Sequence, residues 1–353
     1  MDKRTTKTTQ LNLELISKED YKPIIKQHFN TTFARQGKTG VFAKRIFNLC
    51  LAKMDESTPK LEPVYIPIKD IVSKSELDEH YGGSIINLAK TGITELGALS
   101  MWVINKKGNL EFNHFIESGS EIIPNTGMMR IILNYRIRDY YRQLKHYTIF
   151  ELDMFMRVKS WYSQRFIEVL STFRDNGFWL VSVDKYRDVM GTNYYNAKGK
   201  LMKQLYSDVN LLITKTTKEP LEELKETYLE IGEIEKIYDK TKTGRGRKPI
   251  THLKFHLKQK QIKKIPEIWR TNRYTKDIIV KMEEYKMDEP KIVRFCLSLG
   301  RGQVLEVIER IEKVRRENGI YKLKEYSTRA FTKAIEKHRE TILNSLKEQG
   351  LTD

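Results

Sequence analysis

The segment with the clearest chemical character is a run of positive charge. Residues 241–264 contain nine lysines and arginines and no aspartate or glutamate. Side chains of this kind at this density suit contacts to the phosphates of nucleic acid, along the backbone or into the minor groove. Glycines separate the cations at the start of this run. We predict that three of these cations contact phosphate: Arg245, Arg247 and Lys248.

A second set of polar residues falls at helical spacing just upstream. If Leu201, Leu205 and Val209 face the core of a helix over residues 194–209, the opposite stripe is polar. That stripe consists of Asn196, Lys200, Lys203 and Ser207, and Lys198 and Gln204 flank it. Asparagine suits adenine, and lysine suits guanine or phosphate. Lysines on an outer helix face are often only solvated, but the basic run that follows favours a base-reading helix.

Signals for catalysis or metal binding are weak. Gly37-Lys38-Thr39 resembles the end of a phosphate-binding loop, but Thr32 stands where the motif needs its first glycine. His252 and His256 share one face of an expected strand, yet no third ligand is placed with them. A rolling-circle nickase would need a paired-histidine metal motif, and no His-apolar-His motif occurs. We expect no enzymatic activity, no catalytic residue, no metal and no cofactor.

The composition agrees with a protein that binds nucleic acid. Among 353 residues, 64 lysines and arginines face 46 aspartates and glutamates, for a formal charge of +18. Such an excess fits a polyanionic partner. The two cysteines are too few for a disulfide framework or a cysteine-based zinc site. No apolar run approaches the ~18 residues of a membrane span, so we expect a cytoplasmic protein.

The elements that would position these residues occur twice in the same order: helix, strand, helix, helix and hairpin. The first series lies at 41–54, 63–66, 68–72, 86–96 and 101–104 with 110–112. The second series lies at 165–174, 178–181, 183–190, 194–209 and 211–214 with 250–257. Ser182 is a good N-cap for the helix that begins at residue 183, and Gly191 is a good stop for it. This order is typical of a winged helix, which contains a helix-turn-helix.

The predicted fold class is α+β, mainly α, with two tandem winged helices. We place them at residues 38–147 and 148–260, after an arm or linker over 1–37 and before an all-helical segment over 261–353. Residues 215–249 are expected to form an insertion between the last two strands. Its first part, 219–239, has eight acidic and two basic residues and is interpreted as a solvated helix.

Several stretches resemble one known family, the plasmid replication initiators of the RepB/RepE-like, iteron-binding type. WYSQRFIEVL at 161–170 is similar to the helix that opens their second winged-helix domain. VDKYRDVMG at 183–191 and GRKPITHLKF at 246–255 resemble later parts of the same domain. GMMRIIL at 127–133 and YYRQL at 140–144 resemble the end of the first domain.

The resemblance implies binding to repeated double-stranded DNA sites at a plasmid origin. The second domain would read bases, and the first would hold phosphates. It also implies a homodimer through the first winged helix that represses its own gene. The monomer would open the origin and recruit the host replication initiator and the replicative helicase. A winged-helix transcriptional regulator without a replication role, a nickase, and a single-strand or RNA binder that stacks bases on tyrosines are the alternatives.

Overall fold

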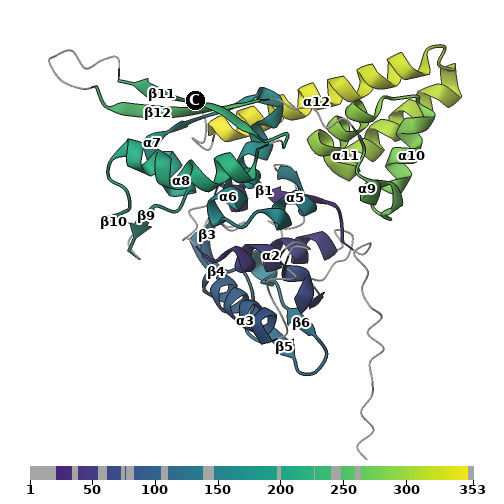
Figure 1. Cartoon of the computed structure of the whole chain (residues 1–353). Coiled ribbons are helices and arrows are strands. Elements are labelled where there is room, and N and C mark those ends of the chain that lie inside the picture. Colours follow the sequence, from purple (N-terminus) through teal and green to yellow (C-terminus); the bar gives the residue numbers. More distant parts are fainter. Residues whose placement is uncertain are drawn as a thin grey trace, which may run out of the picture.

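The computed structural model shows two α/β units followed by a helical module (Figure 1). It describes residues 21–33, 39–54, 62–72, 76, 83–104, 110–137, 147–196, 200–225, 227–239, 248–258 and 264–348. The architecture is α+β and mainly helical, which confirms the predicted fold class.

The first unit contains two long helices and a small antiparallel sheet. Its elements are α2 (Val41–Lys53), β2 (Val64–Pro67), η2 (Ile68–Ile71), α3 (Gly83–Ala98), β3 (Ser100–Ile104), β4 (Leu110–His114), β5 (Glu121–Ile123), β6 (Met128–Ile131) and η4 (Tyr135–Ile137). The sheet has the order β2-β6-β5, and β3 pairs with β4 as a hairpin. Ile46 and Cys50 of α2 are fully buried, as are Ile66 and Met129 of the sheet. The helix, strand and hairpin positions expected for this half of the chain are therefore confirmed.

The second unit is built around stacked aromatic rings. Its main elements are α6 (Trp161–Phe173), η5 (Arg174–Asn176), β8 (Phe178–Ser182), α7 (Val183–Val189), α8 (Val209–Glu223), β11 (Ile231–Tyr238) and β12 (Ile250–Leu257). The sheet has the order β11-β12-β8 and is antiparallel. Phe255 of β12 lies 5.2 Å from Trp179, 5.3 Å from Tyr186 and 5.4 Å from Phe166, measured between ring centroids. The strands β8 and β12 and the helices α6 and α7 therefore pack around one apolar centre.

Local signals at the start of this unit act as expected. Gly177 ends the turn after α6 with a φ of 78°, a conformation that favours glycine. The Ser182 hydroxyl accepts a hydrogen bond from the backbone N–H of Lys185 at 3.3 Å and so caps α7.

The helix predicted over residues 194–209 is wrong. That stretch forms a hairpin of β9 (Asn193–Tyr195) and β10 (Leu201–Gln204), and the next helix, α8, begins only at Val209. The strand predicted over 211–214 lies inside α8. The insertion expected over 215–249 is not separate either: its acidic part, 219–239, is expected to be a solvated helix, but it contains the end of α8 and the strand β11.

The wrong strand prediction over 211–214 has a physical reason in the threonines and branched residues of α8. Leu212, Ile213, Thr216 and Thr217 suggest a strand by type, but their spacing puts all four on one buried helix face. The hydroxyls of Thr216 and Thr217 donate to the carbonyls of Leu212 and Ile213, each at 2.8 Å, so the helix satisfies them internally.

Residues 21–33 differ from the expected arm. β1 (Ile24–His28) pairs with β7 (Tyr147–Glu151), and α1 (Phe29–Thr32) and α5 (Leu152–Arg157) follow these two strands. Tyr21, Ile25 and Phe33 are buried. The β1–β7 ribbon contacts α2 of the first unit, α6 of the second and α11 of the C-terminal module. It therefore joins all three parts.

The C-terminal module is helical throughout its described length, as expected. It contains α9 (Glu267–Thr271), α10 (Lys276–Glu284), α11 (Glu289–Asn318) and α12 (Leu323–Glu348). α11 is kinked at Gly300, whose φ is 68°. A Cβ atom there would lie 2.7 Å from Cε of Lys26 and 3.0 Å from Cδ1 of Ile149, so another residue would be strained by this φ and would also displace these side chains.

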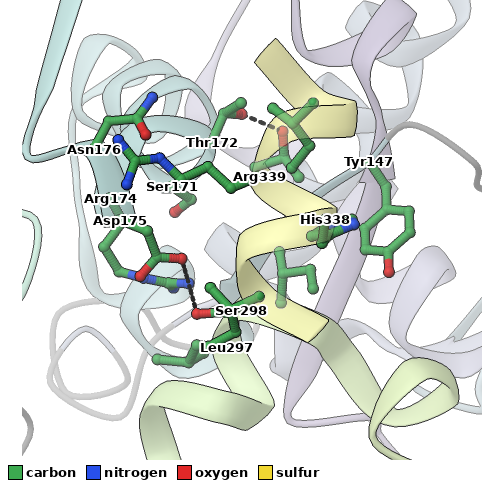
Figure 2. A pocket seen from close by; sticks show the side chains of 14 residues that line it. Tyr147, Ser171, Thr172, Arg174, Asp175, Asn176, Leu297, Ser298, His338 and Arg339 are labelled. Carbon is green, nitrogen blue, oxygen red and sulfur yellow. Dashed lines mark hydrogen bonds and ion pairs between the residues drawn. The ribbon is translucent and has the colours of Figure 1, made fainter. Parts of the chain in front are cut away.

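Figure 2 shows where α12 returns to the body of the protein. The ring of His338 on α12 lies 5.1 Å from the ring of Tyr147 on β7. The hydroxyl of Tyr147 donates to the carbonyl of Leu299 at 2.9 Å, and Arg174 donates to the Ser298 hydroxyl at 3.2 Å. The module is thus attached through polar contacts as well as apolar packing.

Buried charges link the first two units. Lys44 of α2 lies 2.7 Å from the Glu168 carboxylate of α6, and Arg165 donates to the same oxygen. Both side chains of α6 are fully buried. Burial lowers the pKa of Lys44 from 10.5 to about 7, because the loss of hydration outweighs the attraction of Glu168.

The buried cluster gives a stability prediction. Glu168→Gln should lower the free energy of unfolding by about 3–5 kcal/mol, because the buried Arg165 guanidinium loses its counter-ion. Lys44→Met should be near neutral, because Arg165 still neutralises Glu168. Urea unfolding followed by tryptophan fluorescence measures both. A greater loss from Lys44→Met than from Glu168→Gln would contradict this account of the cluster.

Candidate nucleic-acid interface

Helix α8 presents one exposed face beside its buried one. The Asp208 carboxylate caps it by accepting from the N–H of Leu211 at 2.8 Å. The buried face packs on α6 and on Tyr186 of α7, whose hydroxyl lies 2.5 Å from that of Thr216. On the opposite side, the exposed residues of the first turns are Leu211, Thr214, Lys215 and Lys218. The outer face of α8 therefore combines a hydroxyl, an apolar side chain and two cations.

The charge of α8 changes sign along its length. Glu219 and Glu222 are exposed in its last turns. Glu223 has a structural role, because its carboxylate accepts from the backbone N–H groups of Lys159 and Ser160 at 3.1 and 3.2 Å. The cationic part of the helix is thus its N-terminal and central part.

The strands β11 and β12 form the wing that follows α8. Lys248 is exposed just before β12, whereas Arg245 and Arg247 lie outside the described residues. On β11, the Glu235 carboxylate lies 3.1 Å from His256 Nε2 and 3.8 Å from Lys254 Nζ of β12. These neighbours, the His256 hydrogen bond first, lower the pKa of Glu235. Part of the acidic charge of β11 is therefore neutralised within the wing.

The residues expected on a base-reading helix come together on the β9–β10 hairpin instead. Asn196 follows β9, and its side chain accepts from the N–H of Lys200 at 2.9 Å. Lys200, Lys203, Gln204 and Ser207 are exposed or partly exposed. Lys198 lies outside the described residues. Asn196, Lys200, Lys203 and Gln204 therefore belong to a hairpin and not to a helix, and Ser207 follows that hairpin.

Sequence reasoning missed the exposed face of α8. The signals that could have found it are Asp208 as an N-cap and the pairs 212–213 and 216–217, which repeat at a spacing of four. An alternative start at Asn193 and apolar residues at 201, 205 and 209 matched a helix equally well by spacing. Leu201 is 43% exposed, however, so that spacing does not mark a buried face.

The hairpin is fixed to the start of α8. Arg187, at the end of α7, donates to the carbonyls of Leu205, Tyr206 and Ser207 at 2.9, 2.8 and 2.9 Å. The Tyr195 hydroxyl donates to Asp188 at 2.6 Å. The last turn of α7 therefore holds both the base of the hairpin and the approach to α8.

The described residues offer no cluster of metal ligands: no three histidine, cysteine, aspartate or glutamate side chains gather in them. His252 contacts the Thr251 hydroxyl, and His256 contacts Glu235, at 3.1 Å each. Within the same part of the chain, no helix is both long and apolar enough to cross a membrane.

Comparison with known proteins points to one family. Residues 24–171 match the family model described as "Initiator Replication protein, WH1". The match begins with β1 and ends inside α6, so it includes the buried Lys44, Arg165 and Glu168. No curated protein sequence matches the chain.

The fold is also found among solved structures. The chain is similar to the protein in "Crystal structure of Pi initiator protein in complex with iteron DNA", with a TM-score of 0.52 and 20% sequence identity. The similarity covers 68% of this chain and 99% of that chain.

The anchoring of the hairpin can be tested through Arg187. Arg187→Ala should leave three carbonyls without their donor and loosen residues 193–207. We expect faster amide hydrogen exchange over 193–207 with little change in α6. Lys215→Ala, which removes an exposed side chain of α8, is the control and should leave exchange in the hairpin unchanged. Unaltered exchange in the Arg187 variant would show that other contacts hold the hairpin.

Proposed function

We propose that this protein is a plasmid replication initiator that binds repeated double-stranded DNA at an origin, on the premise that residues 24–171 match the family model described as "Initiator Replication protein, WH1". The observation that carries the proposal is the exposed cationic face of α8, which is followed by strands β11 and β12; the sequence between these strands is basic. The net charge of +18 supports a polyanionic partner. The Pi initiator protein, which shares the fold, was solved in complex with iteron DNA.

In the proposed complex, α8 enters the major groove and reads bases. The second helix of a helix-turn-helix contacts base edges with its N-terminal residues. Thr214 and Lys215 lie on the exposed face of that part of α8. Lysine suits guanine acceptors, and threonine offers a hydroxyl and a methyl group to thymine or to other edges. The base-reading role that the sequence assigned to residues 194–209 therefore passes to α8.

The wing supplies the part of the affinity that does not depend on sequence. Arg245, Arg247 and Lys248 belong to the connection between β11 and β12 or to its edge, and we assign them to phosphates. Lys236 of β11 donates to Asn210 of α8 at 2.8 Å, so the wing and the helix start are tied together. Contacts of the wing thereby set the position of α8 on the duplex.

The proposal extends to the later steps of initiation on the strength of the family alone. These steps are origin opening, recruitment of the host initiator and the helicase, and repression of the protein's own gene by a dimer formed through the first winged helix. A plasmid that carries only this gene and its neighbouring DNA should replicate in a host without another origin for it. If that plasmid fails to replicate while the protein binds the same DNA, the protein is a transcriptional regulator.

The first binding measurement is a footprint with salt titration on duplex DNA that flanks the gene. We expect protection of regularly spaced direct repeats. Lys215→Ala should lower affinity for the repeat by about 1–3 kcal/mol and for random duplex by less. Replacing both Arg245 and Arg247 by alanine should weaken binding to all duplexes and reduce the salt slope by about 0.9 per lost contact.

Lys276→Ala on α10 is the matched control, because it removes one exposed lysine from the C-terminal module. It should leave the footprint unchanged. Equal losses on repeat and random DNA for Lys215→Ala would remove the base-reading role of α8. Uniform binding without protected repeats would overturn the proposed function.

A further inference from the structure

A hairpin stands between α7 and α8, where a helix-turn-helix ordinarily has a turn of three or four residues. Residues 193–204 contain three lysines and no acidic residue. The hairpin and the wing extend from the same side of the second unit, with α8 between them in the view (Figure 1). The extra strands are therefore placed next to the surface that we assign to DNA.

Strand β10 of the hairpin contains a β-bulge. Leu201 pairs with Tyr195, and Lys203 pairs with Tyr194, so Met202 is an extra residue on β10. Bulges re-aim side chains and are common beside functional sites. Met202 is 66% exposed, and Leu201, its neighbour in the chain, is 43% exposed. The hairpin thus presents an apolar ridge to the solvent.

Lysines lie on both sides of this ridge. Lys200 and Lys203 are exposed and flank Leu201 and Met202 in the sequence. A surface that combines apolar side chains with lysines and lacks acids favours a polyanion with an apolar interior. Duplex DNA has both properties, because phosphates line its grooves and stacked bases lie between them.

The attachment of the hairpin fixes where it meets the duplex. Its strand β10 ends at Gln204, and the cap of α8 is Asp208. Arg187 holds the three carbonyls between these points. If the N-terminal part of α8 lies in the major groove, an element attached directly before it meets the neighbouring strand of the backbone and the minor groove beyond.

We propose that the β9–β10 hairpin is a second DNA-contacting element, in which Met202 and Leu201 form an apolar wedge in the minor groove and Lys200 and Lys203 bind the flanking phosphates. This inference rests on the proposed function. Methionine and leucine are among the side chains that insert between base steps in minor-groove complexes and kink the duplex. The lysines supply the salt-dependent part of the contact.

The test separates the wedge from the lysines on the DNA fragment that the wild-type protein protects. Lys200→Ala with Lys203→Ala should reduce the salt slope by about 1.8, or 0.9 for each lost phosphate contact. Met202→Ala should leave the slope unchanged and reduce the DNA bend, measured by energy transfer between dyes at the two ends of the fragment. Val280→Ala and Lys276→Ala, which truncate exposed residues of α10, are the matched controls.

The outcomes distinguish this inference from the function on which it rests. If the wild-type protein protects no repeat, the proposed function fails, and the hairpin contact fails with it. If the wild-type protein protects repeats and the hairpin variants keep its affinity, salt slope and bend, only the hairpin contact is overturned. Hairpin variants that bind and bend DNA normally but sediment with altered self-association would show that the ridge meets protein, which also overturns the inference.

Discussion

The buried carboxylate of Glu168 is the point on which the arrangement of the first two units depends. It forms ion pairs with Lys44 of the first unit and with Arg165 of its own helix, and all three side chains are buried. Arg165 also donates to the carbonyls of Thr32 and Val189. A charge taken out of water must keep its partners, so α1, α2, α6 and the end of α7 can meet in few other ways.

Through α7, that constraint reaches the surface that we assign to DNA. Val189 is the last residue of α7, and Arg187 of the same turn holds the approach to α8. The last turn of α7 therefore contacts the junction of the units through the Val189 carbonyl and holds the approach to α8 through Arg187. The β1–β7 ribbon adds the C-terminal module to the same junction, because it contacts α2, α6 and α11.

Much of the fold could be predicted from the sequence because its signals are local. The cap at Ser182 and the helices at 41–54 and 165–174 are each determined by neighbouring residues, and each is confirmed. The exposed face of α8 could not be found in the same way. Its threonines and isoleucine favour a strand by type, and only burial against α6 and Tyr186 makes their helical spacing decisive. The contribution of β1 was missed because its partner, β7, lies far away in the chain, on the other side of the whole first unit.

In the proposed complex with DNA, the sign change along α8 gives the molecule a direction on the duplex. Lysines at 215 and 218 attract phosphates, whereas the exposed carboxylates at 219 and 222 repel them. Reversing the helix in the groove would bring the acidic end against the backbone, so only one polarity of docking is favourable. A protein that docks in one polarity distinguishes a sequence from its reverse complement. Successive copies on a row of identical sites would then all face the same way, and the assembled array would have two different ends.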